Sequence, residues 1–284
     1  MSNIFILKAN CPAKSGIVAA VTGFLYEKGC YLQELHQFDD PVTGQFFMRA
    51  ECEIETGEES IASISYGFAE VASQFDMQWK VHDVTQPAKV LIMVSKFDHC
   101  LDDLLYRLRK GELDIEVTAI VSNHKTLRPI AERDGFRFIH MPITKKNKAS
   151  QEEALVEIIE ETKTELVVLA RYMQILTKEL CQKLPGKIIN IHHSFLPGFK
   201  GAKPYHQAYR RGVKLIGATA HYVTSDLDEG PIIEQSVQPV DHSFTPEMLV
   251  AVGRDTETVA LARAVKLHTS HRVFLNNNKT VILR

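Results

Sequence analysis

The sequence lacks the features that would tie it to a membrane, a disulfide framework or a nucleic acid. Its five cysteines are scattered without any C-x-x-C pair, which fits reduced thiols better than disulfides or a zinc knot. No apolar run reaches the roughly 18 residues needed to span a bilayer, and the first residues read as a strand rather than a signal peptide. The net charge of −2 argues against general polyanion binding. We therefore expect a cytoplasmic protein that binds neither nucleic acid nor membrane.

The length and the residue pattern indicate two α/β domains. The chain has 284 residues, and an ordinary domain has roughly 100–200. The polar segment 83–87 contains a proline and reads as a linker, which predicts domains at 1–84 and 88–284. We find no internal repeat and no low-complexity segment.

The first domain shows the order β-α-β-β-α-β, which is typical of a ferredoxin-like fold. The loop 10–16 is marked by proline and glycine, and the helix after it is stopped by Gly29. The predicted strands and helices are a strand at 4–7, a helix from 17 to Gly29, a hairpin of 31–39 and 45–54, a helix at about 58–75, and a strand at 77–81.

This stretch resembles an ACT domain, a small module that often binds amino acids and pairs with itself. The resemblance is carried by the loop ending in Gly16, the helix entry Ile17-Val18-Ala19 and the terminus Glu27-Lys28-Gly29. Asn10 and the longer loop 12–16 depart from the Asp-Arg-Pro-Gly-like loop of such domains. The resemblance implies a homo-oligomer, and it leaves open whether the domain binds an amino-acid effector or only dimerises.

The second domain alternates strands and helices, which predicts a Rossmann-like, mainly parallel sheet covered on both faces. Two later strands, 215–224 and 231–240, are joined by too short a loop for a parallel crossover, so we expect them to be antiparallel. Thr245-Pro246 is typical of a helix start, and that helix is expected to end near His268. The remaining predicted elements are strands at 89–95, 115–121, 136–140, 166–170 and 187–189, helices at 98–110, 125–134, 150–162 and 205–211, and a closing hairpin at 272–283.

The stretch Asn190–Gly198 is the strongest candidate for a site. It follows the apolar end of a strand, where ligands gather in open α/β sheets. Side chains alternate along a strand, so Asn190 and His192 are expected on one face while His193 points away. An imidazole can transfer a proton near neutral pH, and an amide can donate to developing negative charge.

Asp228 could join this pair, because it lies in the loop between the two antiparallel strands. A carboxylate there can orient a water molecule and accept a proton. From spacing alone, a lone loop histidine such as His192 is more often structural than catalytic, and an aspartate placed like Asp228 is usually a turn former. None of the four histidines His192, His193, His206 and His221 shows metal-ligand spacing, so we expect no metal.

Several short blocks in order resemble the folate-dependent formyltransferase family, from about Lys89 to the C-terminus. They are Asn190-Ile191-His192, Ser194–Pro197, Gly201, Gly217–His221 and Asp228–Ile233. The resemblance implies that Asn190, His192 and Asp228 are catalytic and that 10-formyltetrahydrofolate is the substrate, with no separate cofactor. It also implies that the backbone of Arg171–Leu176 binds the pterin ring, with Met173, Gln174, Ile175 and Leu176 lining it. The residues alone also fit a helix start that faces the core.

The acceptor of the formyl group is indicated by a departure from the family pattern. Transferases that act on a phosphorylated amine have a glycine-rich phosphate loop after the first strand, and here 95–100 contains no glycine. With His192-His193-Ser194, the loop Gly198–Pro204 and the preceding ACT-like domain, the chain looks like the branch of the family in which water accepts the formyl group. In such an enzyme His221 would give a supporting hydrogen bond, although it also fits a packed strand histidine. The alternatives are a transferase that uses a non-phosphorylated amine, and a folate or amino-acid sensor without turnover.

Overall fold

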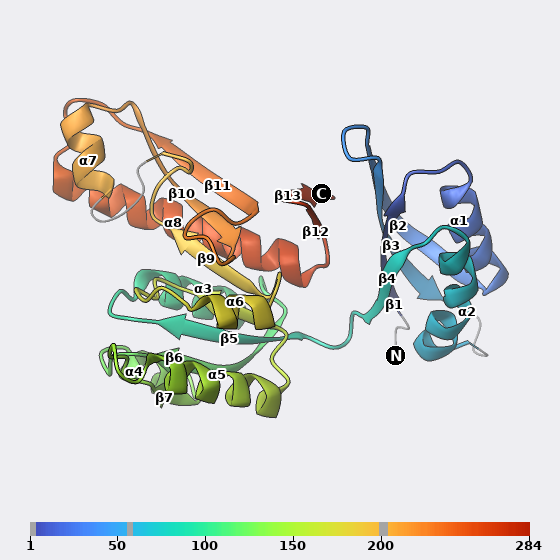
Figure 1. The fold of residues 1–284 in the computed structure, drawn as a ribbon, viewed down its shortest axis with the longest axis horizontal. Coiled ribbons are helices and arrows are strands. Elements are labelled where there is room, and N and C mark those ends of the chain that lie inside the picture. Colours follow the sequence, from blue (N-terminus) through green and yellow to red (C-terminus); the bar gives the residue numbers. More distant parts are fainter. Residues whose placement is uncertain (1–3, 56–58, 199–203) are drawn as a thin grey trace. The chain divides into compact units, whose positions relative to one another are not determined.

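The chain forms two compact units in the computed structural model, which describes residues 4–55, 59–198 and 204–284 (Figure 1). The first unit combines 1–87 with 270–284, and the second unit is 88–269. The predicted linker therefore marks the boundary between Pro87 and Ala88. The predicted second domain, 88–284, differs from the second unit at its C-terminal end, because the last 15 residues group with the first unit.

The first unit contains an antiparallel sheet of order β2-β3-β1-β4, and the predicted β-α-β-β-α-β order is present. β1 continues to Pro12, which pairs with Gln45, so the predicted loop at 10–16 begins later than expected. The predicted helix start near Glu58 lies outside the described residues. The elements are β1 (Ile4–Pro12), α1 (Ile17–Glu27), β2 (Cys30–Asp40), β3 (Gln45–Ile54), α2 (Ile61–Gln74) and β4 (Gln78–Asp83).

Both helices of the first unit pack on one face of this sheet. Ile17, Val21 and Leu25 of α1 recur every fourth residue and are buried, as are Ile64 and Phe68 of α2. A stripe with this spacing lies along one side of a helix, so it can be covered by the apolar face of the sheet. The two helices do not cover the opposite face of the sheet, so another element can pack there.

The C-terminal hairpin packs with this same sheet. β12 (Val273–Asn276) and β13 (Lys279–Ile282) are joined by a two-residue turn in which Asn277 has a φ of 56°. Phe274 and Leu283 form a buried cluster with Phe47 of β3, and the two phenyl rings lie 5.5 Å apart. The predicted hairpin is confirmed, but its assignment to the second domain was wrong, since its apolar side chains are buried against β3.

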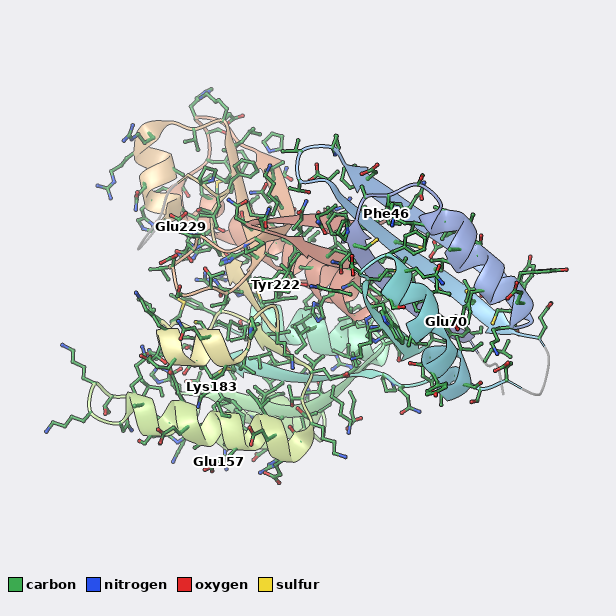
Figure 2. All side chains as sticks on the ribbon, turned by 45° about the vertical axis from the view of Figure 1, so that its right-hand side comes forward. Phe46, Glu70, Glu157, Lys183, Tyr222 and Glu229 are labelled. Atoms are coloured by element: carbon green, nitrogen blue, oxygen red, sulfur yellow. The ribbon has the colours of Figure 1, made fainter. Side chains whose placement is uncertain are left out.

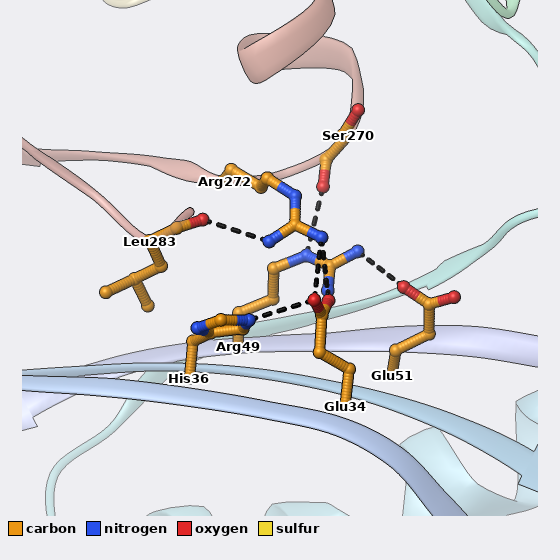
Figure 3. Close-up of polar contacts among 7 residues, drawn as sticks. All are labelled: Glu34, His36, Arg49, Glu51, Ser270, Arg272 and Leu283. Atoms are coloured by element: carbon orange, nitrogen blue, oxygen red, sulfur yellow. Dashed lines mark hydrogen bonds and ion pairs between the residues drawn. The ribbon is translucent and has the colours of Figure 1, made fainter.

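A charged network joins the hairpin to the sheet (Figure 3). Arg49 is 2% exposed, donates from Nε to the carbonyl of Ser270, and is ion-paired with Glu34 and Glu51. Arg272 donates to Glu34 at 2.7 Å and to the carbonyl of Leu283 at 3.1 Å. Glu34 is thus shared between an arginine of the sheet and an arginine of the C-terminal segment.

Replacing Glu34 by glutamine is expected to destabilise the first unit by about 1–3 kcal/mol at neutral pH, because a buried arginine loses a charged partner. Burial alone would raise the pKa of Glu34, but hydrogen bonds from His36 and Arg272 outweigh it and lower the pKa below 4.5. The contribution is therefore fully present above the unfolded pKa and is lost as the pH falls through the lowered folded value.

Trp79 is the single tryptophan of the chain and packs against the core of the first unit, so its fluorescence during denaturant unfolding reports on that unit. The difference between wild type and Glu34→Gln should be largest near pH 7 and should shrink below about pH 4.5. Asp39→Asn, at an exposed residue of the same strand, is the matched control and should change little. A pH-independent difference would contradict the ionic origin of the effect.

The second unit is built on a sheet of order β11-β10-β9-β8-β5-β6-β7. β5 to β9 are parallel, as the mainly parallel sheet predicted, and β10 runs antiparallel to β11, as its short loop predicted. β10 also runs antiparallel to β9, which was not predicted from the sequence. The strands are β5 (Ala88–Val94), β6 (Ile115–Ser122), β7 (Phe138–His140), β8 (Leu166–Leu169), β9 (Ile188–His192), β10 (Leu215–Tyr222) and β11 (Ile232–Pro239).

Helices cover both faces of this sheet (Figure 1). α5 and α6 pack on one face, α3 and α8 pack against each other, and α8 runs along β9 to β11. Thr245 caps α8 by accepting from the N–H of Met248, as its sequence predicted. No helix in the described ranges is both long and apolar enough to cross a bilayer. The helices are α3 (His99–Arg109), α4 (Arg128–Arg133), α5 (Lys148–Thr162), α6 (Lys178–Lys183), α7 (Pro204–Arg211) and α8 (Pro246–Thr269).

The strand order creates one switch point in the second unit. From β5 the chain goes to β6 and β7 on one side, and it later returns to β8 on the other side of β5. The loops after β5 and β8 therefore diverge, leaving a crevice at the carboxyl ends of these strands. The loop after β9 begins at the same edge, because β9 is parallel to β8.

Candidate active site

A cavity of about 580 Å³ opens at this edge of the second unit. Its walls come from the segments that follow β5, β8 and β9, from the turn between β10 and β11, and from α7 and α8. All eight predicted site residues line it: Met173, Gln174, Ile175, Leu176, Asn190, His192, His221 and Asp228. The structure thus brings together residues that are up to 55 positions apart in the chain.

Asn190 and His192 lie on the same strand and both line the cavity, as the alternation along β9 predicted. β10 pairs His221 directly with Asn190, and the Asn190 Nδ2 lies 3.3 Å from the His221 Nε2. The His221 Nδ1 lies 2.9 Å from the carbonyl oxygen of Tyr222, so it donates there. His221 can then accept from Asn190, which leaves the second amide hydrogen of Asn190 for a ligand.

Asp228 completes the group from the turn between β10 and β11. Its Oδ1 lies 3.3 Å from the His192 Nδ1 and 3.9 Å from the His221 Nε2. Asp228 has a φ of 57°, in the left-handed region that aspartate and asparagine tolerate better than most residues. A Cβ at Gly230 would lie 1.7 Å from the carbonyl oxygen of Tyr222, so only glycine allows the chain to pass there. Tyr222 and Glu229, on the two sides of this passage, are labelled in Figure 2.

The electrostatics of the group favour an ionised aspartate. The hydrogen bond from His192 is the main cause that lowers the pKa of Asp228 below 3.8, and burial opposes it. Burial lowers the pKa of His221, which favours the neutral imidazole. The Nε2 of His192 is buried and has no hydrogen-bond partner in the described part of the chain. Asp228 can thus hold the Nδ1 side of His192 while the Nε2 side is available to a ligand.

The segment 171–176 is irregular and connects β8 to α6. Met173 and Ile175 are exposed at 50% and 61% and line the cavity, so the alternative of a helix start facing the core is wrong. The Ser95 hydroxyl accepts from the backbone N–H of Met173 at 2.9 Å and donates to Asn123 at 2.7 Å. Ser95, at the end of β5, thereby fixes the start of this segment.

His193 also lines the cavity, which corrects the prediction that it points away. β9 ends at His192, so the strand alternation no longer applies to the next residue. Its ring lies 5.3 Å from the ring of His192, and burial lowers its pKa to about 4. His193 is therefore neutral at physiological pH. The predicted motif residues Gly201 and 199–203 lie outside the described residues.

Sequence reasoning missed a buried ionic cluster in the same cavity wall. Glu257 of α8 is 1% exposed and accepts from the Tyr205 hydroxyl at 2.8 Å and from the His99 Nε2 at 2.8 Å. The Arg171 Nε lies 3.3 Å from the same carboxylate. The sequence does contain one sign of this cluster. Glu257 is an acidic residue that lies three or four positions from Gly253, Ala260 and Leu261, and so on the same buried face of the helix.

His99, Cys100 and Glu257 have ligand atoms within 4.8 Å of one another, a spacing that a metal ion could bridge. The carboxylate of Glu257 already has three protein partners, one of which is a guanidinium. Burial and the nearby Glu257 raise the pKa of Cys100 well above its usual value, so it carries a neutral thiol. The donor set of this cluster therefore does not favour a cation.

Comparisons with known proteins find relatives of this chain in one family. The model of the formyl transferase family matches residues 88–265. A formyltetrahydrofolate deformylase from Corynebacterium sp. (strain P-1) is 53% identical over 98% of both chains. The crystal structure of a formyltetrahydrofolate deformylase from Burkholderia mallei has 52% identity and a TM-score of 0.95, and covers 99% of this chain and 100% of that one.

A glycinamide ribonucleotide transformylase from Symbiobacterium toebii is 28% identical with a TM-score of 0.65, and it covers 70% of this chain and 95% of its own. The two deformylases align with almost the whole chain and therefore with both units. The transformylase covers 70% of the chain, a share close to that of the second unit alone. The chain therefore belongs to the formyltetrahydrofolate deformylase family and carries the mixed α/β formyl transferase fold, with its mainly parallel central sheet.

Proposed function

We propose that the protein hydrolyses 10-formyltetrahydrofolate to tetrahydrofolate and formate in the cavity of the second unit. The proposal is carried by the contact between Asp228 and His192 beside Asn190, with the His192 Nε2 left without a described partner. It is supported by the family, whose members bear the name of this reaction. The reaction consumes one water molecule, and it breaks the bond between the formyl carbon and the folate nitrogen.

In the proposed mechanism Asp228 acts as the acceptor that orients the attacking water. Its lowered pKa keeps it ionised, and only Oδ1 has described side-chain partners, so Oδ2 can receive a hydrogen bond from water. The water oxygen bonds to the formyl carbon, and the carbonyl oxygen becomes an oxyanion. As the water attacks, one of its protons passes to Asp228. Asn190 and a protonated His192, through its Nε2–H, donate to the oxyanion. The bond between carbon and nitrogen then breaks as the proton held by Asp228 passes to the folate nitrogen, so tetrahydrofolate and formic acid leave, and the acid ionises to formate.

The pterin ring is proposed to lie along 173–176. Met173 and Ile175 present exposed apolar surface in the cavity, and the irregular backbone here leaves N–H and C=O groups outside a regular ladder. His221 is proposed to position Asn190 through the 3.3 Å contact. Water is the proposed acceptor because Ser95, where a transferase would carry its phosphate loop, is buried and bonded within the protein.

The first unit is proposed to be an ACT-like domain that assembles the protein as a homo-oligomer and carries a regulatory role. Its β-α-β-β-α-β order and the left-handed Gly16 before α1 support this proposal. We propose that this reaction takes place in the cytoplasm, as part of one-carbon metabolism, and that it serves purine biosynthesis. Titrating amino acids into the activity assay would identify an effector.

Incubating the purified protein with 10-formyltetrahydrofolate and no acceptor is expected to release formate and tetrahydrofolate in equal amounts. The progress of both products should be followed, because a folate sensor would bind the substrate without turnover. An amine-dependent transferase would show little release in water, and its rate would rise with an added amine such as glycinamide. Either of these results would reject hydrolysis as the main reaction.

A further inference from the structure

Arg171 is an unusual residue in the cavity wall. It is 8% exposed and adopts a φ of 63°, a left-handed conformation that is unfavourable for a residue other than glycine. Strain of this kind persists where the surrounding structure holds a side chain in place, and it is concentrated at functional sites.

The guanidinium of Arg171 has Glu257 on one side and Phe97 on another. Its Nε lies 3.3 Å from a Glu257 oxygen without the geometry of a hydrogen bond, and its Cζ lies 5.0 Å from the ring centre of Phe97. Within residues 4–55, 59–198 and 204–284, no side chain or carbonyl accepts a hydrogen bond from its Nη1 or Nη2. A nearly buried cation with unused donors lines the cavity in which Asp228 and His192 meet.

Glu257 is the counter-ion that allows this arginine to be buried. Tyr205 and His99 occupy the carboxylate with hydrogen bonds, so Glu257 neutralises Arg171 without saturating its donors. A short series of contacts connects the cluster to the proposed catalytic residues, because the ring of His193 lies 6.3 Å from that of Tyr205 and 5.3 Å from that of His192. His193 itself is neutral and adds no competing charge.

We infer that Arg171, positioned by Glu257, is an anion subsite that receives the formate product. A planar carboxylate matches the paired N–H groups of a guanidinium. The ligand must be small, because Phe97 and Glu257 cover two sides of Arg171. The inference rests on the proposed hydrolysis for the identity of the anion.

Formate binding can be measured without turnover, by titrating formate into the full-length protein in a calorimeter or by ¹³C-formate line broadening. The double variant Arg171→Met/Glu257→Gln removes both charges, so no unpaired carboxylate is left buried. It is expected to bind formate at least tenfold more weakly than wild type. Tetrahydrofolate binding weakened by the same factor as formate binding would place a folate carboxylate at Arg171 and overturn the inference.

The single variant Glu257→Gln gives the opposite sign, because it removes the charge that competes with formate and is expected to tighten formate binding severalfold. A folding defect cannot produce both results. Arg254→Met is the matched control, since Arg254 lies on α8 and lines the same cavity but is exposed, and it should change formate binding by less than about threefold. Equal formate binding by wild type and the double variant, or weaker binding by Glu257→Gln, would overturn the inference.

The two proposals fail in different ways. If the protein releases formate but binds added formate independently of Arg171, the subsite is wrong and the hydrolysis stands. If the protein binds formate through Arg171 but releases none from 10-formyltetrahydrofolate, the anion subsite stands and the proposed reaction is wrong.

Discussion

Replacing Asp228 by asparagine is expected to lower the rate of formate release from 10-formyltetrahydrofolate by about 10²–10⁴-fold. The substitution removes the carboxylate that lies 3.3 Å from the His192 Nδ1. An asparagine amide cannot accept a proton from water, and it presents a donor where the proposed mechanism needs an acceptor. Steady-state turnover with no added acceptor measures the effect.

The fold should survive this substitution. Asparagine tolerates the left-handed conformation at φ 57° and keeps the size of the side chain. The asparagine oxygen can still accept from the His192 Nδ1. We therefore expect an unchanged circular dichroism spectrum and only a modest loss of stability from the missing charge.

Asp226→Asn is the matched control for this prediction. Asp226 lies two residues earlier in the same turn and lines the same cavity, but it is exposed and no described residue hydrogen-bonds its carboxylate. Its replacement should leave turnover within about threefold of wild type. Full turnover by Asp228→Asn, or an equal loss in both variants, would contradict the role assigned to Asp228.

Local patterns in the sequence predicted much of the second unit because they depend on neighbours in the chain. The alternation along β9 placed Asn190 and His192 on one face, and the short loop before Ile232 required β10 and β11 to be antiparallel. These inferences need only the geometry of a strand and the length of a loop. The contact of Asp228 with His192 was suggested by the resemblance to the family, because spacing alone left it open.

The features that were missed depend on pairs of residues far apart in the chain. The hairpin at 273–282 joins the first unit through Phe47 and Glu34, more than 200 positions earlier. Arg171 and Glu257 are 86 positions apart, and nothing in the segment 171–176 indicates that its arginine pairs with Glu257. His193 was misplaced because the strand ends one residue before it. Side-chain pairing at such separations is set by the packing of whole elements, which no window of sequence contains.

His192 variants are expected to separate its two nitrogens and to give the second large effect. The Nδ1 contacts Asp228 at 3.3 Å, whereas the Nε2 is buried without a described partner. In the proposed mechanism the Nε2 side donates to the oxyanion, a role whose loss costs about 10²–10³-fold in rate. Both glutamine and asparagine lose proton transfer, which adds to this cost.

The two substitutions differ in which nitrogen they imitate. The amide of His192→Gln reaches about as far as the imidazole Nε2, while the amide of His192→Asn reaches about as far as Nδ1. We therefore expect turnover by His192→Gln to exceed turnover by His192→Asn by about tenfold or more, with similar Michaelis constants for the folate. The measurement is kcat for formate release, with tetrahydrofolate binding as the control for an intact cavity.

The reverse order would indicate that the contact with Asp228 matters more than the donor at Nε2. His192 would then act mainly by holding the aspartate, and the oxyanion would depend on Asn190 alone. Asn190→Ala distinguishes these cases, because it should then be as damaging as the worse His192 variant. If the Nε2 side also donates, Asn190→Ala should retain part of the oxyanion stabilisation, and its loss of rate should stay near the lower end of about 10²–10³-fold.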